Sequence, residues 1–135
     1  MEFIFPVRVY YEDTDVAGVV YYANYLKFME RGRTEWLRSY GADQDVLIDQ
    51  DVAFAVGGVE LKYLKPARFN DALEVVTKIE KLGKASVHFY QQVRSADEPS
   101  VIYCQGSIKV VCVTMSNMQP RPIPKSLWED LRRDS

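Results

Sequence analysis

Histidine and cysteine, which supply many catalytic and metal-binding sites, are scarce in this sequence. His88 is the only histidine, and no Gly-x-Ser-x-Gly motif offers it a nucleophile, so we expect a structural or surface role for its side chain. Cys104 and Cys112 are the only cysteines. They fall in one β-prone segment, on the same face but too far apart along a strand to form a disulfide, which predicts two reduced thiols.

The sequence also lacks a strong excess of either charge and any long hydrophobic run. A net charge of -2 leaves no positive surplus to neutralise phosphates, which argues against a nucleic-acid-binding protein. No apolar run approaches the ~20 residues that cross a bilayer. Glu2 stands where a signal peptide would need basic residues. We therefore expect a cytoplasmic protein without a membrane span, folded as one domain over its 135 residues (1–135).

Hydrophobic periodicity predicts the order of the secondary structure. A β-prone segment at 3–11 precedes a stretch at 22–40 in which apolar residues recur with helical spacing. From Val52 onward apolar residues alternate, which predicts strands. Ser126–Glu129 has the spacing of a capping box and predicts a short helix, while Pro120 argues against strand pairing before it. The expected strands cover residues 3–11, 52–64, 73–80, 85–93 and 101–114.

This order of elements predicts an α+β fold in which an antiparallel sheet curls around one helix. Gly32 inside the helical pattern would let another backbone or a sheet approach closely, and Gly57-Gly58 inside a strand indicates a bulge or a sharp bend. The second face of the sheet would also carry apolar side chains, which favours a homo-oligomer, either a dimer or a dimer of dimers (a homotetramer). The residues expected on that face are Val76, Ile102, Cys104 and Ile108.

Three acidic residues and a glycine lie between the first strand and the long helix. A carboxylate beside a helix N-terminus can attack an acyl carbon or activate water, while free backbone N–H groups hold the developing oxyanion. The carboxylates of this segment are Glu12, Asp13 and Asp15. Asp15 could instead shape the turn, as we expect of Asp13. The pair could also offer oxygen ligands to a metal, but the continuation of an EF-hand is missing.

The sequence from Tyr11 to Tyr22, Tyr-Glu-Asp-Thr-Asp-x-x-Gly-Val-Val-Tyr-Tyr, and the helix after it, Ala-Asn-Tyr-Leu-Lys-Phe-Met-Glu-Arg-x-Arg-Thr-Glu-Trp-Leu, form a specific motif. They resemble the 4-hydroxybenzoyl-CoA thioesterase family of hotdog-fold enzymes, and within it the Tol–Pal-associated acyl-CoA thioesterases. Residues 62–68 and 118–124 are similar to the same subgroup. The resemblance implies a hotdog fold and an acyl-CoA thioesterase that needs no metal and no cofactor.

The resemblance also implies roles for individual residues. Asp15 matches the catalytic carboxylate, and the backbone N–H of Tyr22 matches the donor that polarises the thioester carbonyl. Tyr11 matches a tyrosine near the acid. The subgroup usually has histidine at the position of Tyr22, which argues against a histidine base here. Gly18 and Val19 would border the thioester, and Tyr25 would line the acyl pocket.

Basic residues near a predicted hairpin turn, Lys81 and Lys84, could clamp the phosphates of coenzyme A or could simply be solvated. Glu30 could likewise face the site or the solvent. Three functions stay open: hydrolysis of short-chain, aromatic or fatty acyl-CoA, non-catalytic binding of acyl-CoA or acyl carrier protein, and a partner of the cell-envelope machinery. Within the first, Asp15 could act as nucleophile or as general base.

Overall fold

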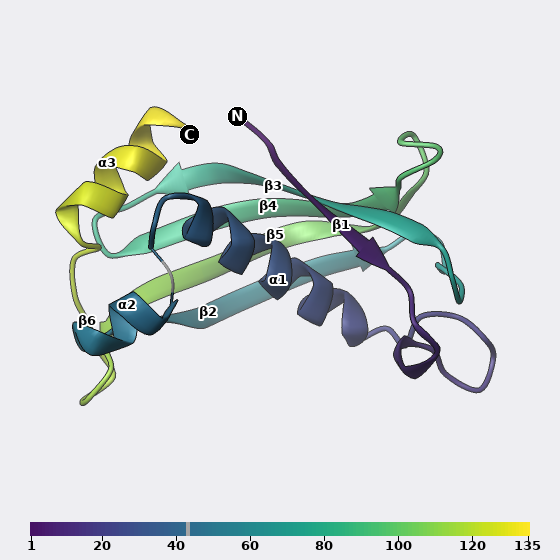
Figure 1. The fold of residues 1–135 in the computed structure, drawn as a ribbon, viewed down its shortest axis with the longest axis horizontal. Coiled ribbons are helices and arrows are strands. Elements are labelled where there is room, and N and C mark those ends of the chain that lie inside the picture. Colours follow the sequence, from purple (N-terminus) through teal and green to yellow (C-terminus); the bar gives the residue numbers. More distant parts are fainter. Residues whose placement is uncertain (43) are drawn as a thin grey trace.

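The computed structural model describes residues 1–42 and 44–135, and Figure 1 shows one long helix lying across a strongly curved sheet. The strands are β1 (Phe3–Arg8), β2 (Val52–Tyr63), β3 (Ala72–Leu82), β4 (Ser86–Ser95), β5 (Ile102–Thr114) and β6 (Gln119–Pro120). The helices are α1 (Asn24–Ser39), α2 (Gln44–Asp49) and α3 (Lys125–Arg133), with a 3-10 turn at Tyr11–Asp13.

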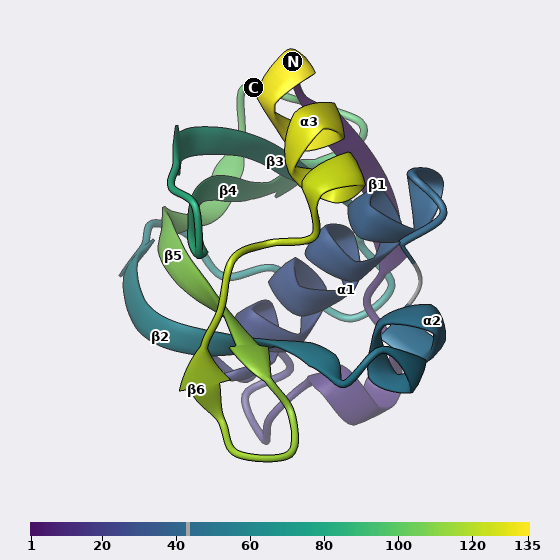
Figure 2. The ribbon, with the colours of Figure 1, turned by 90° about the vertical axis from the view of Figure 1, so that its left-hand side faces the viewer.

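The strands form one antiparallel sheet in the order β1-β3-β4-β5-β2, with β6 paired to β5. The sheet curls around α1, which lies on its concave face, while α3 packs near the turn between β3 and β4 (Figure 2). The predicted antiparallel sheet around one helix is therefore confirmed. Within the described residues, no helix is both long enough and apolar enough to cross a membrane.

The core lies between α1 and the sheet. Phe28, Met29 and Trp36 on α1 are almost fully buried against inward-facing strand residues. A Cβ added to Gly32 would lie 2.8 Å from Cγ1 of Val75, so only glycine allows the helix to sit this close to β3. This contact confirms the role predicted for Gly32.

Two predictions about the strands have different outcomes. The register between β2 and β5 shifts between Val56 and Gly58, which confirms the predicted bulge. In contrast, Cys104 and Ile108 were expected on the outer face and belong to the core cluster beneath α1. The alternation of apolar residues did not show which side chains of β5 face α1, because both faces of this strand are rich in apolar residues. The two cysteines are free and buried.

The predicted ends of several elements were wrong. β1 stops at Arg8 rather than continuing to residue 11, and α1 begins at Asn24, not at residue 22. The structure adds α2, which the sequence analysis did not predict. Pro124 is the N-cap of α3, so Ser126 lies inside the helix and forms no capping box. Pro120 does pair with β5, in the two-residue edge strand β6.

Candidate active site

The acidic segment folds into a small hairpin just before α1. The backbone N–H of Asp15 donates to the carbonyl of Val19 at 2.9 Å, and the N–H of Gly18 donates to the carbonyl of Asp15 at 3.0 Å. Gly18 has a φ of +78°, a left-handed conformation that favours glycine. The predicted turn at Gly18 is thus present.

Backbone hydrogen bonds fix this hairpin to the end of the sheet where β2 finishes. Val20 N–H donates to the carbonyl of Ala67 at 2.8 Å, and Val19 forms an isolated bridge with Arg68. The hydroxyl of Tyr25, a buried residue on α1, accepts from the N–H of Ala67 at 3.1 Å. Burial raises the pKa of this phenol. Tyr25 therefore links α1 to Ala67, the residue that also binds Val20 of the hairpin.

The two aspartates of the hairpin have different surroundings. Oδ2 of Asp13 accepts from the N–H of Tyr10 at 2.8 Å, and the carbonyl of Asp13 accepts from the side chain of Asn24 at 2.9 Å. Asp13 thus shapes the turn, as expected. Asp15 is exposed, and its Oδ1 accepts from the N–H of Ala17 at 2.9 Å. Its Oδ2 has no hydrogen-bond partner among the described residues, so one oxygen holds the turn while the other stays available.

Free N–H groups also occur between the hairpin and α1, just before the first residue of the helix. Among the residues that the structure describes, the N–H groups of Tyr22 and Ala23 have no acceptor. Because the first N–H groups of a helix carry partial positive charge, a carbonyl oxygen bound there would be polarised. The side chain of Tyr22 is 61% exposed, and its ring packs edge-on against Tyr63 of β2, with centroids 6.0 Å apart.

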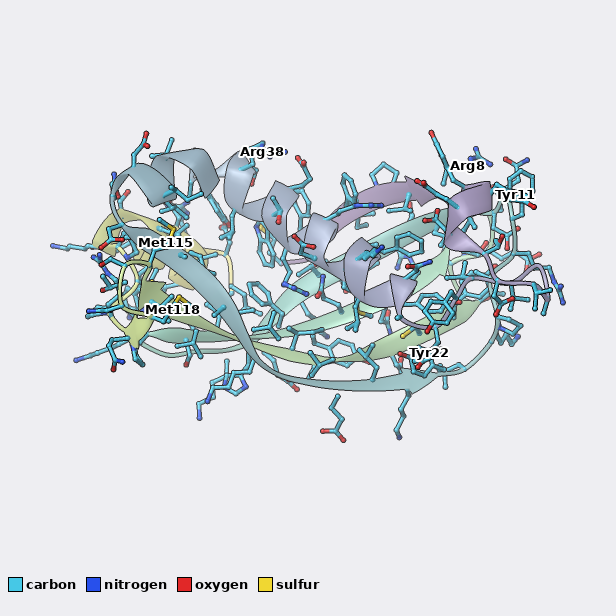
Figure 3. The ribbon with its side chains drawn as sticks, turned by 90° about the horizontal axis from the view of Figure 1, so that it is seen from below. Arg8, Tyr11, Tyr22, Arg38, Met115 and Met118 are labelled. Carbon is cyan, nitrogen blue, oxygen red and sulfur yellow. The ribbon has the colours of Figure 1, made fainter. Side chains whose placement is uncertain are left out.

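A shallow hollow surrounds Asp15. Tyr11 borders it and is 82% exposed, with its ring at 6.3 Å from that of Phe69. Tyr11 and Tyr22 lie at the same end of the molecule, far from Met115 and Met118 (Figure 3). Of the predicted site residues, Tyr11, Asp15 and Gly18 line this hollow. The hollow is lined by Tyr11, Thr14, Asp15, Val16, Gly18 and Phe69.

A groove of about 520 Å³ lies further along α1, between this helix and the strands. It begins at Leu26, about one helical turn beyond Tyr22. The groove is mainly apolar, and the exposed residue Glu30 borders it. Its lining residues are Leu26, Lys27, Glu30, Arg33, Thr34, Leu37, Phe54, Val56, Val59, Val87, Phe89, Ile108, Val110 and Leu131.

A polar network under the groove was missed by the sequence analysis. Arg33 donates to Oε1 of Gln91 at 2.9 Å, and Nε2 of Gln91 donates to Oγ1 of Thr77 at 2.8 Å and to the carbonyl of Met29 at 2.9 Å. Gln91 and Thr77 are fully buried. Burial lowers the pKa of the Arg33 guanidinium, and the charge of Glu30 opposes this shift. The available signal was a polar residue, Gln91, at an inward position of β4.

Lys81 and Lys84 lie at the opposite end of the same protomer. They flank the turn between β3 and β4, where the carbonyl of Lys84 accepts from Ile123 and that of Gly83 accepts from the indole of Trp128. The length of β3 separates this turn from the acidic hairpin by about 30 Å at ~3.3 Å per residue. Within one protomer these lysines and Asp15 do not form a single site.

Comparisons with known proteins agree with this architecture. A model described as the thioesterase-like superfamily matches residues 9–131. The acyl-CoA thioester hydrolase YbgC of Escherichia coli O6:H1 is 41% identical over 131 residues, covering 97% of this chain and 96% of that protein. A probable thioesterase from Bartonella henselae superposes with a TM-score of 0.85 at 30% identity, covering 92% of this chain and 100% of that one.

A gentisyl-coenzyme A thioesterase of known structure is also similar, with a TM-score of 0.85 at 26% identity over 95% of this chain and 98% of that one. The fold is that of the hotdog thioesterases, as the resemblance implied. The chain belongs to the thioesterase-like superfamily.

Proposed function

We propose that this protein hydrolyses acyl-CoA thioesters and that Asp15 is its catalytic carboxylate. The observation that carries the proposal is the junction between the hairpin and α1. There an exposed carboxylate with one unpaired oxygen is followed in the sequence by the N–H groups of Tyr22 and Ala23, which have no acceptor in the described part of the chain. The relative named as an acyl-CoA thioester hydrolase supports the choice of substrate class.

In the proposed reaction, the thioester oxygen accepts a hydrogen bond from the N–H of Tyr22. Such a donor typically lowers the barrier by about 3 kcal/mol. Asp15 then removes a proton from water as the water oxygen attacks the carbonyl carbon. Collapse of the tetrahedral intermediate breaks the C–S bond, and the proton passes to the thiolate of coenzyme A. Gly18 and Val19, with no bulky polar side chains, would border the reacting group, and the phenol of Tyr11 would lie over it.

A second route gives Asp15 the role of nucleophile. Its oxygen would displace the thiolate to form a mixed anhydride, which water would then hydrolyse. A single turnover in water labelled with oxygen-18 separates the two routes. Label in the Asp15 carboxylate would establish the anhydride, whereas label in the released acid alone would exclude an anhydride that water opens at the Asp15 carbonyl.

A second copy of the chain is the proposed partner of β2. This strand is an edge of the sheet, it is twelve residues long, and Val56 and Val59 at its centre are exposed. Long apolar edge strands readily pair with another chain. Antiparallel pairing about the bulge would give a two-fold dimer, and two such dimers could form a tetramer. Gel filtration with light scattering would test this, and a stable monomer would contradict it.

Such a dimer would also bring Asp15 of one copy and the lysine turn of the other copy to the same end of the joined sheet. Antiparallel pairing places the first half of one β2 beside the second half of the other. The turn with Lys81 and Lys84 of one copy would then lie at the end of the sheet that carries Asp15 of the other. The proposed role of these lysines, to bind the phosphates of coenzyme A, requires this arrangement.

The acyl slot in this proposal is the groove beside α1, entered past Tyr22 and Tyr25. Hydrolysis is tested by measuring thiol release from short-chain, aromatic and long-chain acyl-CoAs and from an acyl carrier protein thioester. Release from one or more of them would support the enzyme. Tight binding without release would support the non-catalytic acyl-CoA or acyl carrier protein binding module instead.

A further inference from the structure

We propose that Arg33 interrupts the apolar wall that α1 gives to the acyl slot and so limits the length of the acyl chain that the enzyme accepts. The inference rests on the proposed function, because it takes the groove beside α1 as the place of the acyl chain. It makes Arg33 a residue that determines specificity and not a catalytic residue.

The groove changes character along its length. At the end near the acidic hairpin its walls are Leu26 from α1 and Val59 from β2. One to two helical turns further on, the side chains of Glu30 and Arg33 replace the apolar wall of the helix. On the helix side the groove presents Leu26 and Lys27 first, Glu30 and Arg33 next, and Leu37 last. An alkyl chain that runs along α1 therefore meets the charged groups of Glu30 and Arg33 before it can reach the apolar surface beyond them.

The guanidinium of Arg33 is held in place and is not free to move out of the way. One of its N–H groups donates to Gln91, which is fully buried and is itself fixed by Thr77 and the carbonyl of Met29. Swinging Arg33 toward solvent would leave the buried oxygen of Gln91 without its partner, which costs free energy. Within the described residues Arg33 forms no ion pair, so the rest of its donors stay hydrated only while the adjacent groove holds water.

A long alkyl chain would remove that water. Burying a charged group against hydrocarbon without a compensating partner is unfavourable. The penalty falls only on chains that reach Arg33, and shorter chains escape it. The position of Arg33 thus acts as a length limit.

The helix gives an approximate length for this limit. Tyr22 and Arg33 are eleven residues apart, which corresponds to about 16 Å along a helix at 1.5 Å per residue. An extended chain advances about 1.2 Å per bond, since three backbone bonds span ~3.3–3.6 Å. Because helical side chains lean toward the N-terminus, the guanidinium lies somewhat nearer than its Cα. Chains of up to about ten carbons would stop short of Arg33, and chains of sixteen would run into it.

A second copy paired to β2 would not remove this limit. Phe54, Val56 and Val59 of the groove wall come from this edge strand. A partner strand there would close the open side of the groove and leave the wall formed by α1 in place.

The experiment measures kcat/KM for saturated acyl-CoAs from four to sixteen carbons. It compares wild type with Arg33→Met, which keeps the length of the side chain but not its charge. Arg31→Met is the matched control, because Arg31 lies on the same helix, is exposed and is not part of the groove. Unfolding midpoints are recorded for all three proteins, and Arg33→Met/Gln91→Met, which replaces both partners by apolar groups, is made in case the single variant does not fold.

We expect wild type to lose activity sharply between ten and sixteen carbons. Arg33→Met should raise the ratio of kcat/KM for the sixteen-carbon to the eight-carbon substrate at least tenfold, and Arg31→Met should leave that ratio unchanged. A wild-type profile without a decline, or a folded Arg33→Met protein with the wild-type profile, would overturn the proposal.

The same variants separate this inference from the proposed function. If wild type hydrolyses none of the thioesters, the proposed function fails, and binding of non-hydrolysable S-alkyl-CoA thioethers is measured with the same chain lengths. A wild-type affinity that falls beyond ten carbons and recovers in Arg33→Met would support the length limit. An affinity that continues to rise with chain length in both proteins would overturn it.

Discussion

The acidic hairpin and the groove beside α1 are built by different kinds of contact. The hairpin is held by backbone hydrogen bonds between near neighbours, such as that from Gly18 to Asp15. The groove is built from side chains of α1, β2, β4, β5 and α3, with Arg33 and Gln91 from distant parts of the sequence at its base. The difference shows that a catalytic group can be positioned locally while the space for its substrate depends on the whole fold.

Asp15→Asn in the hairpin is expected to cause the largest change, a loss of catalytic activity. The amide can still accept the hydrogen bond from Ala17, so the hairpin and the free energy of unfolding should change little. If Asp15 does the chemistry, kcat should fall by about 10²- to 10⁴-fold. Glu12→Gln, which removes a charge from the same exposed segment, is the control and should keep activity. An unchanged kcat in Asp15→Asn would remove the catalytic role from the hairpin.

The next largest effect is expected on the packing of the helix that forms the groove. Gly32→Ala would place a methyl group 2.8 Å from Val75, so α1 must move or β3 must yield. We expect a loss of about 1–2 kcal/mol in the free energy of unfolding, as overpacking outweighs the better helix propensity of alanine. Urea denaturation measures this. Gly58→Ala, with open space around the new methyl, should change stability much less.

Two glycines with positive φ test whether the hairpin's shape serves activity. Gly18 has a φ of +78° and Gly41 a φ of +76°, and an added methyl meets no atom within 4 Å at either site. Replacing either by alanine should cost about 1–2 kcal/mol of stability through backbone strain. Only Gly18→Ala should also lower kcat, because it displaces Asp15. Equal kcat in the two variants would show that the conformation of the turn at Gly18 is not needed for catalysis.

The smallest effect on stability at neutral pH is expected from two ionisable groups of the core. Burial raises the pKa of the Cys104 thiol to about 12 and is the main cause that raises the pKa of Tyr40 to about 12. The folded protein thus keeps protons that the unfolded chain releases above about pH 9 and 10. Stability should be constant up to pH 9 and fall as the pH rises toward 12. Urea midpoints across this range would show it, and a rise in stability would contradict the assignment.

The hairpin was predictable from the sequence because its determinants are close together. A turn is indicated by Asp13, Asp15 and Gly18, and the helical pattern of α1 follows directly in the sequence. Gly32 and the bulge at Gly57-Gly58 were predictable for the same reason, since a glycine inside a regular pattern marks a close approach or an irregularity.

The groove and its polar base could not be derived in the same way. The link between Arg33 and Gln91 joins residues that are 58 positions apart, and periodicity does not show which helical side chain meets which strand. The phase of β5 was misjudged because both of its faces carry apolar residues. The distance from Lys84 to Asp15 likewise depends on strand topology, so the sequence did not show that these residues lie at opposite ends of one protomer.

The most direct test of the central claim is thiol release from a panel of acyl-CoAs by wild type and Asp15→Asn side by side. The account predicts release by wild type from at least one substrate and a loss of about 10²- to 10⁴-fold in the folded variant. Equal release by both proteins, or none by wild type from any acyl-CoA, would contradict it.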